Sequence, residues 1–355
     1  FISFSSTAQV NLDSLWNVWN DKTQADTNRL KAMTQIAKNG YLNSQPDSAF
    51  YFSQLQYDFA KSINNKKWMA MALNTQGSSF YLRGNMSKAI DYYTRSLKIE
   101  EEIGNKKGIA ASLNNIGVIY KDQSDLAKAI GYYTKSLKIK EEIGDKKGIA
   151  NSLNNIGIIY DDQGDLAKAL DYHTKSLKMD QELGDKSGIA TSLNNIGNIY
   201  QTKGDLDKAM NYFTKSLKIF EELGNKCGIA MSLNNIGENY FYQFDYSKAM
   251  DYLTRGLMID EEMGNKKDIE ICLNNIGNIY KKQGYYYKAL EKYTEALGIA
   301  REIGNVETIH DASGSLWKIN KKLGKHKQAL EMHELYIQMR DSILSIENKE
   351  AIIQQ

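Results

Sequence analysis

One nine-residue motif occurs five times in this sequence, always 40 residues after the previous copy. The copies are SLNNIGVIY at Ser112, SLNNIGIIY at Ser152, SLNNIGNIY at Ser192, SLNNIGENY at Ser232 and CLNNIGNIY at Cys272. A repeat of this length is one structural unit that cannot bury its hydrophobic face alone, so neighbouring units must stack. The period therefore predicts a solenoid.

Diverged copies extend the series at both ends: AMTQIAKNGY from Ala32, ALNTQGSSFY from Ala72 and ASGSLWKIN from Ala312. Terminal repeats must cap a core that the inner repeats share, so divergence there is expected. We predict eight repeats within residues 27–346, between an N-terminal segment (1–26) and a helical tail (347–355). The predicted repeats are 27–66, 67–106, 107–146, 147–186, 187–226, 227–266, 267–306 and 307–346.

Each repeat reads as two amphipathic helices, A and B. In the third repeat, apolar residues fall on one stripe of each helix at ~100° per residue: Ile109, Leu113, Ile116, Gly117 and Tyr120 in helix A, and Leu126, Ala129, Ile130, Tyr133 and Leu137 in helix B. Helices A and B are separated by Gln-Ser-Asp or Gln-Gly-Asp. The middle residue is expected to end helix A, and the aspartate that follows, Asp125 or Asp165, is predicted to be the N-cap of helix B. The expected fold class is all-α.

The spacing of large and small residues resembles the tetratricopeptide repeat. Leu113-x-x-Ile116-Gly117-x-x-Tyr120 followed by Ala129-x-x-x-Tyr133 is similar to that family's pattern. The resemblance implies a right-handed superhelical solenoid and a scaffold that binds protein or extended peptide. Gly117 and Ala129 would let helices A and B approach closely. Glu141 replaces the family's usual closing proline, and the period exceeds the usual ~34 residues, so helix B is expected to be longer.

Among long-repeat members, the sequence resembles kinesin light chain and bacterial peptide-sensing receptors. The motifs GDKKGIA and SLNNIG are most similar to those in the extracytoplasmic sensor regions of Bacteroidetes-type signalling proteins. That resemblance implies a signalling role, and a periplasmic or extracellular location in a bacterium. The segment Phe1–Gln9 reads either as the tail of a secretory signal peptide or as an ordinary frayed terminus.

Composition and motif content argue against several other functions. The net charge of +2 lacks the basic excess of nucleic-acid modules, and no apolar stretch is long enough to span a membrane. Cys227 and Cys272 are too few for a disulfide framework or a metal cluster. The four histidines form no metal-ligand pair, and His173 replaces a core tyrosine of the repeat. We expect no enzyme activity, no cofactor and no metal.

The five near-identical repeats vary mainly on one face of helix A, which the family resemblance places on a concave groove. Hypervariability there indicates either a specificity surface or drift on a solvated face. Our candidates for binding from this face are Asp161, Asp162, Asn198, Glu238, Phe241, Tyr242, Asn278, Lys281 and Lys282. Aromatic Phe241 and Tyr242 precede a basic run, so we predict a peptide whose acidic group or C-terminal carboxylate lies near Lys281 and Lys282.

The first asparagine of each motif is invariant and adjoins the variable face. A carboxamide can pair with both groups of a peptide unit, so such a row could hold an extended backbone. Alternatively, these side chains bridge adjacent A helices; the sequence leaves both readings open. The second asparagine is predicted to bond the neighbouring repeat. The candidate row comprises Asn114, Asn154, Asn194, Asn234 and Asn274, preceded by Asn74.

A second function is compatible with the same fold. A solenoid has two different ends, and if these fit each other the contact is head-to-tail and builds an open filament or tube. The partner would then be another copy of the chain. Separately, the Glu-Glu pairs ending the B helices and the Lys-Lys loops predict ion pairs along one solvated edge.

Overall fold

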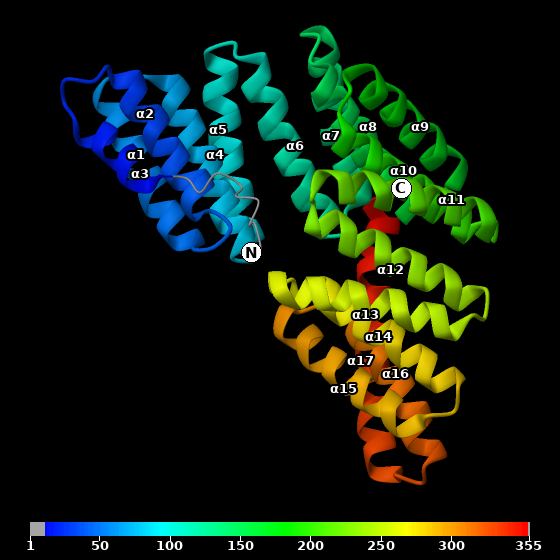
Figure 1. The fold of residues 1–355 in the computed structure, drawn as a ribbon. Helices are drawn as coiled ribbons and strands as arrows, with labels where there is room; N and C mark the ends of the chain where they lie inside the picture. Colours follow the sequence, from blue (N-terminus) through cyan, green and yellow to red (C-terminus); the bar gives the residue numbers. More distant parts are fainter. Residues whose placement is uncertain (1–10, 354–355) are drawn as a thin grey trace, which may run out of the picture. The chain divides into compact units, whose positions relative to one another are not determined.

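The computed structural model describes the backbone of residues 11–353 and the side chains of residues 11–344, and within that range all regular structure is helical (Figure 1). A helices and B helices alternate along the chain, which confirms the all-α solenoid. The elements are α1 (Leu12–Asn20), α2 (Asp26–Gln35), a π-helical segment η1 (Ile36–Tyr41), α3 (Pro46–Ser62), α4 (Lys66–Leu82), α5 (Met86–Glu102), α6 (Lys106–Asp122), α7 (Leu126–Glu142), α8 (Lys146–Asp162), α9 (Leu166–Leu183), α10 (Lys186–Thr202), α11 (Leu206–Leu223), α12 (Lys226–Tyr242), α13 (Tyr246–Met263), α14 (Lys266–Lys282), α15 (Tyr286–Ile303), α16 (Val306–Lys322) and α17 (His326–Ile353).

The helices form two compact units, one ending at Ser152 and the other beginning at Leu153, so the division lies within α8. In the first unit, α5 packs against α4 of its own repeat and against α6 of the next one. In the second unit, α11, α13 and α15 each make the same two contacts with the A helices on either side. Each B helix is thus covered on two sides, which is how stacked repeats share one core.

The first repeat departs from the others, as expected of a terminal one. Its A helix is α2 continued by η1, and α1 packs over both. Trp16 and Trp19 of α1 meet Phe52 and Phe59 of α3 edge to face, with ring centroids 5.9 and 5.3 Å apart. The segment Phe1–Gln9, which we considered as a leader, lies outside the described residues. None of the described helices is both long and apolar enough to cross a bilayer.

The turn between helices A and B follows the predicted chemistry. Gly164 adopts φ +75°, and the side chain of Asp165 accepts a hydrogen bond from the backbone N–H of Lys168 at 3.1 Å. Asp125 caps α7 in the same way. Glycine reaches positive φ without a Cβ clash, and an N-cap carboxylate satisfies a free N–H of the first turn. Both predicted caps are confirmed.

Close approach of helices A and B depends on the glycine of each motif. A Cβ added at Gly117 would lie 2.8 Å from the ring of Tyr133, and one at Gly277 would lie 2.8 Å from Tyr293. Real Cβ atoms do not come that near a ring, so the ring lies directly against the backbone of helix A. The predicted close packing at Gly117 is therefore confirmed.

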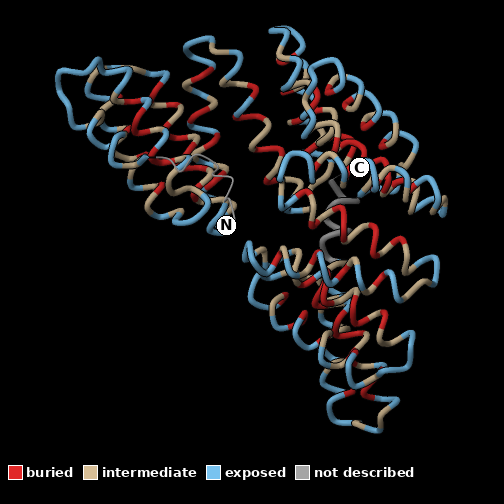
Figure 2. Tube along the Cα trace, in the orientation of Figure 1, coloured by how far each residue is buried: buried red, intermediate tan, exposed pale blue. Residues whose placement is uncertain are grey.

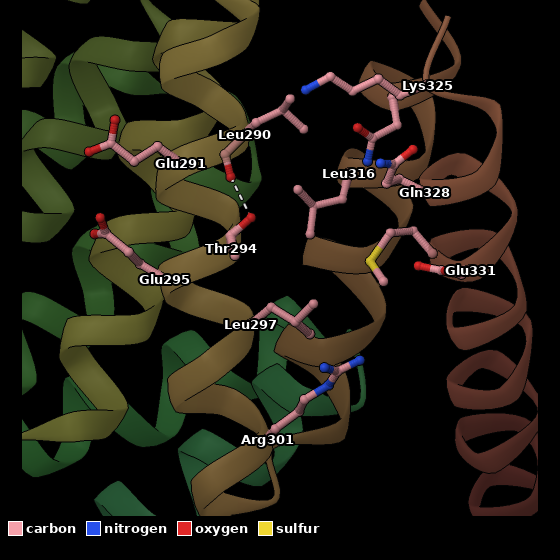
Figure 3. Close-up of a pocket in the computed structure, with 12 residues that line it drawn as sticks. Leu290, Glu291, Thr294, Glu295, Leu297, Arg301, Leu316, Lys325, Gln328 and Glu331 are labelled. Carbon is pink, nitrogen blue, oxygen red and sulfur yellow. Dashed lines mark hydrogen bonds between the residues drawn. The ribbon is translucent and has the colours of Figure 1, made fainter. Parts of the chain in front are cut away.

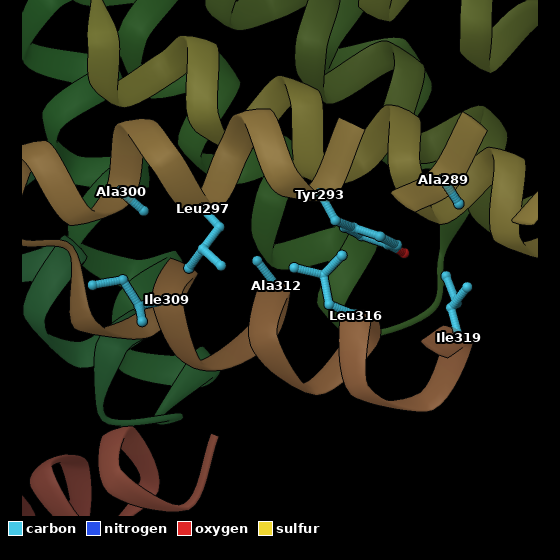
Figure 4. Close-up of a cluster of buried hydrophobic side chains, with 8 residues drawn as sticks. All are labelled: Ala289, Tyr293, Leu297, Ala300, Ile309, Ala312, Leu316 and Ile319. Carbon is cyan, nitrogen blue, oxygen red and sulfur yellow. The ribbon is translucent and has the colours of Figure 1, made fainter. Parts of the chain in front are cut away.

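Buried residues run as a stripe along most of the helices, whereas the turns are largely exposed (Figure 2). Figure 4 shows one cluster, formed where α15 lies against α16. Tyr293 is completely buried there, and its ring lies among aliphatic side chains from both helices. The cluster consists of Ala289, Tyr293, Leu297, Ala300, Ile309, Ala312, Leu316 and Ile319.

The predicted ion pairs connect the two ends of a repeat. Lys106 at the start of α6 pairs with Glu142 at the end of α7, with 2.9 Å between Nζ and Oε2. Lys186 and Glu222 form the same pair in the second unit, at 3.0 Å. Both partners are well exposed in each case, so a pair adds only about 0–1 kcal/mol to stability. The predicted ion pairs along the solvated edge are therefore confirmed at these positions.

Candidate functional site

The variable residues lie on the C-terminal halves of four A helices in the second unit. α12 contacts α10 on one side and α14 on the other, so their variable faces adjoin. Most of these side chains are half-buried rather than fully solvated. The half-buried candidates are Asp161, Asn198, Glu238, Phe241, Asn278 and Lys281; the exposed ones are Asp162, Tyr242 and Lys282.

The structure brings two of the candidates together around the ammonium group of Lys281. Lys281 Nζ donates to Asn278 Oδ1 at 3.1 Å and to Ser315 Oγ at 3.3 Å. Tyr293 OH also donates to Asn278 Oδ1, at 2.7 Å. Burial lowers the pKa of Lys281, and the positive charges of Lys318 and Lys282 lower it further, while Asp311 acts in the opposite direction. Lys281 is thus a half-buried cation whose two hydrogen-bond acceptors are neutral.

A second group of candidates surrounds Glu238 on α12. The hydroxyl of Tyr242 donates to Glu238 Oε1 at 3.3 Å, and the rings of Phe241 and Tyr242 meet edge to face at 5.7 Å. Burial raises the pKa of Glu238, whereas hydrogen bonds from Gln201 and Tyr242 act to lower it. Glu238 therefore holds Tyr242 beside Phe241 and connects α12 to Gln201 on α10.

The acidic part of the face lies at the end of α8. Burial raises the pKa of Asp161, and the adjacent charge of Asp162 raises it further. Asp122, at the equivalent position of α6, belongs to the first unit, where it accepts a hydrogen bond from Tyr81 OH at 2.6 Å. Within the second unit, the face therefore changes from acidic at α8 to basic at α14.

The invariant asparagines act partly as bridges between A helices. Asn195 Nδ2 donates to Asn154 Oδ1 at 2.8 Å, and Asn115 Nδ2 donates to Asn74 Oδ1 at 3.4 Å. The second asparagine thus bonds the preceding repeat, as predicted. Asn154 Oδ1 also lies 3.0 Å from Nδ1 of the buried His173. At these positions the structure has the bridging arrangement that the sequence left as an alternative.

Along the row, the first asparagine does not present its carboxamide uniformly. Asn194 is only 1% exposed, and among the described residues neither end of its carboxamide has a hydrogen-bond partner. Asn234 donates to the buried Asp260 of α13 at 3.2 Å, but the position equivalent to Asp260 in the preceding repeat is Phe220, which cannot accept. Asn114, Asn234 and Asn274 are half-buried. A continuous ladder of free amides is therefore not formed.

A cavity of about 630 Å³ lies away from this face, between α15, α16 and α17 (Figure 3). Its apolar lining includes Leu297, Leu316 and Met332, and Arg301 and Glu331 are among its charged residues. We had not predicted it, because it depends on how α15 and α17 each pack against α16 rather than on any motif. Among the described residues, no cluster of histidine, cysteine and carboxylate side chains has a geometry that suits a metal ion.

Ser315 was missed by the sequence interpretation. It occupies the position of the second asparagine in the diverged eighth repeat, 40 residues after Asn275. Aligning that repeat by its period would have placed it at the contact between α14 and α16, where it accepts from Lys281.

Comparison with known families agrees with this architecture. The profile described as tetratricopeptide repeat matches residues 68–142, 108–182 and 188–262, and a second profile of that description matches residues 272–307. Together these matches cover more than half of the chain. The chain belongs to the tetratricopeptide repeat family. No curated protein sequence matches it.

Several solved tetratricopeptide structures share the fold at low sequence identity. The apo quorum sensor NprR from B. thuringiensis has a TM-score of 0.66 at 16% identity, covering 93% of this chain and 97% of NprR. A Rap protein complexed with competence and sporulation factor has a TM-score of 0.64 at 16% identity, covering 94% and 98%. BtubC (BKLC) from P. vanneervenii has a TM-score of 0.53 at 19% identity, covering 62% and 93%. The expected likeness to long-repeat arrays is confirmed at the level of the fold.

Proposed function

We propose that this tetratricopeptide repeat protein is a non-catalytic scaffold whose A helices in the second unit bind an extended peptide or a segment of another protein. The observation that carries the proposal is the half-buried ammonium of Lys281. Its hydrogen-bond acceptors are the neutral Asn278 and Ser315, while Lys282 and Lys318 add positive charge nearby. A carboxylate placed there would pair with all three cations, and such charge-assisted hydrogen bonds are the stronger kind.

The rest of the face supports a defined direction for the ligand. Tyr242 is 48% exposed beside Phe241 and offers an aromatic surface one repeat away from Lys281. Aromatic anchors next to charged groups are typical of binding hot spots. We therefore place the C-terminal or acidic end of the ligand at α14 and an apolar side chain at α12.

Charge reversal tests this assignment. The variant Lys281→Glu with Lys282→Glu is expected to weaken binding at least about tenfold, because two attractive contacts become repulsive. The measurement is titration of the full chain with hits from an array of short extended peptides, each made with a free and an amidated C-terminus. Lys178→Glu with Lys218→Glu, on exposed positions of α9 and α11, makes the same change in net charge and should leave binding unchanged. Equal affinities for all three proteins would refute the proposed polarity.

The finer role we propose is the sensor part of a bacterial signalling protein that works outside the cytoplasm. The support is the similarity of its repeats to such sensor regions, together with the shared fold of NprR, which is described as a quorum sensor. A sensor of this kind needs only to bind its ligand and to transmit the resulting conformational change to a partner domain. Its export and its partner domain remain part of the proposal.

Self-assembly is a second candidate, favoured by the exposed end of the last repeat. Leu330 of α17 is 59% exposed, whereas Leu290, 40 residues earlier, packs against the core cluster. Another copy of the chain could cover Leu330 through a head-to-tail contact. Light scattering over a wide concentration range would then give masses rising well above the 40.3 kDa of one chain, and Leu330→Glu would suppress the rise. A constant monomer mass would rule this candidate out.

A further inference from the structure

The turns that join helices A and B in repeats six and seven carry aromatic residues at positions where the preceding repeats have small or capping ones. Phe244 stands where repeats four and five have Gly164 and Gly204. Tyr285 stands where they have Asp165 and Asp205, and Tyr287 replaces Ala167 of repeat four and Asp207 of repeat five. The repeats are otherwise closely similar, so these three substitutions distinguish one edge of the second unit.

Two of the substitutions break local rules that the equivalent turns of repeats four and five obey. Phe244 has φ +64°, a left-handed conformation that a bulky side chain rarely adopts. At Tyr285 no side chain caps α15, whereas Asp165 and Asp205 cap the corresponding helices. Both changes disfavour the folded turn locally. A strained backbone conformation and a missing helix cap that are nevertheless retained in a fold often mark a functional position.

Packing does not compensate for the strain. Phe244 is 74% exposed, Tyr285 is 57% exposed and Tyr287 is 69% exposed. The rings are instead close to cations: Lys288 Nζ lies 5.5 Å from the centre of the Tyr285 ring, and Lys325 Nζ lies 5.2 Å from that of Tyr287. The second contact joins the turn of repeat seven to that of repeat eight, so these turns lie side by side.

The charge of this edge also differs from that of the earlier turns. Residues 281–288 contain three lysines and no acidic residue, and residues 321–328 contain four lysines and no acidic residue. The corresponding turn of repeat four, by contrast, contains Asp161, Asp162 and Asp165 with only Lys168. Exposed aromatic rings and unopposed positive charge therefore occur together in the last repeats.

We propose that this edge, consisting of Phe244, Tyr285, Tyr287, Lys288, Lys325 and Lys327, binds the surface of an anionic lipid bilayer. Aromatic rings partition to the boundary between headgroups and acyl chains, and lysines are attracted to acidic headgroups. Turns project beyond the helix ends, so several of them can touch a flat surface at once. An extended peptide would instead need a recess lined on two sides. The exposure of all three rings on projecting turns therefore favours a lipid surface over a bound peptide, and the lysines favour an anionic one.

The proposed membrane edge goes beyond the proposed peptide-binding role and does not depend on it. Lys281 and its hydrogen-bond partners Asn278 and Ser315 are half-buried on α14 and α16, whereas the edge residues are on the turns and the starts of α15 and α17. Binding of a peptide and binding of vesicles can therefore be lost separately.

The test is flotation of the full chain with vesicles made of equal parts phosphatidylcholine and phosphatidylglycerol, compared with phosphatidylcholine alone. We expect binding to the anionic vesicles that weakens as salt is raised, because salt screens the attraction. The variant Phe244→Gly, Tyr285→Asp, Tyr287→Ala takes its residues from repeat four. It should bind about tenfold less because the inserted rings are removed. It should also unfold at a higher temperature, which separates lost binding from lost folding.

Two further variants complete the design. Lys325→Glu with Lys327→Glu should remove the preference for phosphatidylglycerol. Met258→Ala removes a 59% exposed apolar side chain from α13 outside this edge and should have no effect. The proposal is overturned if the wild-type chain does not float with anionic vesicles, or if the triple variant floats as well as the wild type. Binding to polyglutamate without binding to vesicles would assign the edge to an acidic protein instead.

Discussion

Replacing Tyr293 with alanine is expected to destabilise the second unit by about 3–5 kcal/mol, as for other large aromatic side chains in cores. Tyr293 is completely buried, its ring lies directly against Gly277, and it packs against α16 in the cluster of Figure 4. The substitution leaves a cavity between α14, α15 and α16 that helix backbones cannot close. It also removes the hydroxyl donor to Asn278 Oδ1. Urea unfolding followed by circular dichroism measures the loss.

Two further tyrosine variants separate the contribution of the buried ring from that of the hydroxyl group. Tyr293→Phe keeps the ring and removes one hydrogen bond, so we expect a loss of about 1 kcal/mol. Tyr285→Ala removes a 57% exposed ring from the same helix region and should not destabilise the chain. If Tyr293→Ala were no more harmful than Tyr285→Ala, the core assignment of this position would be wrong.

Acidification is expected to destabilise the second unit through His173. Burial lowers the pKa of His173 to about 4, against an ordinary value of 6.5 in the unfolded chain. The folded state therefore binds this proton less readily, so the stability is fully present above pH 6.5 and falls as the pH drops towards 4. The expected total loss is about 3 kcal/mol, from about 1.4 kcal/mol per unit of pKa difference. Urea unfolding between pH 7 and pH 4 measures it.

The variant His173→Phe isolates this contribution. Phe213 occupies the equivalent position in the next repeat, facing Gly197, so a phenyl ring fits this kind of site. Asp260 acts in the opposite direction: its pKa is raised to about 6 by burial, so acidification stabilises the fold through that group. Only the difference between His173→Phe and wild type is therefore diagnostic. A difference that does not grow as the pH falls would show that His173 is accessible to protons in the folded state.

The helices and their ends could be read from the sequence because their signals are local. Gly164 and Asp165 end one helix and begin the next through backbone conformation and a cap three residues away. Within each unit, the 40-residue period then placed a helix A next to the following one. The ion pair between Lys106 and Glu142 could also be predicted, because most repeats have lysines in the loop and glutamates at the end of helix B.

The candidate site was less predictable, because its character depends on contacts between repeats. The sequence pointed to Asn278 and Lys281, but not to their shared position beside Ser315 of the eighth repeat. It also left the asparagine row undecided. Whether a carboxamide faces a ligand or a neighbour depends on side chains 26 and 41 residues away, such as Asp260 for Asn234 and Asn195 for Asn154.

For this protein, the sequence by itself determined the family, the alternation of helices, the caps and the glycines that admit an aromatic ring. These features depend on the intrinsic geometry of the backbone and on a pattern of hydrophobic residues that occurs in every repeat. Only the tertiary structure decided which polar groups are buried, which lysines gather, and which aromatic residues remain exposed. Burial and pKa are set by neighbours from adjacent repeats. The same residue type is therefore core at Tyr293 and surface at Tyr285, because their side chains meet different surroundings.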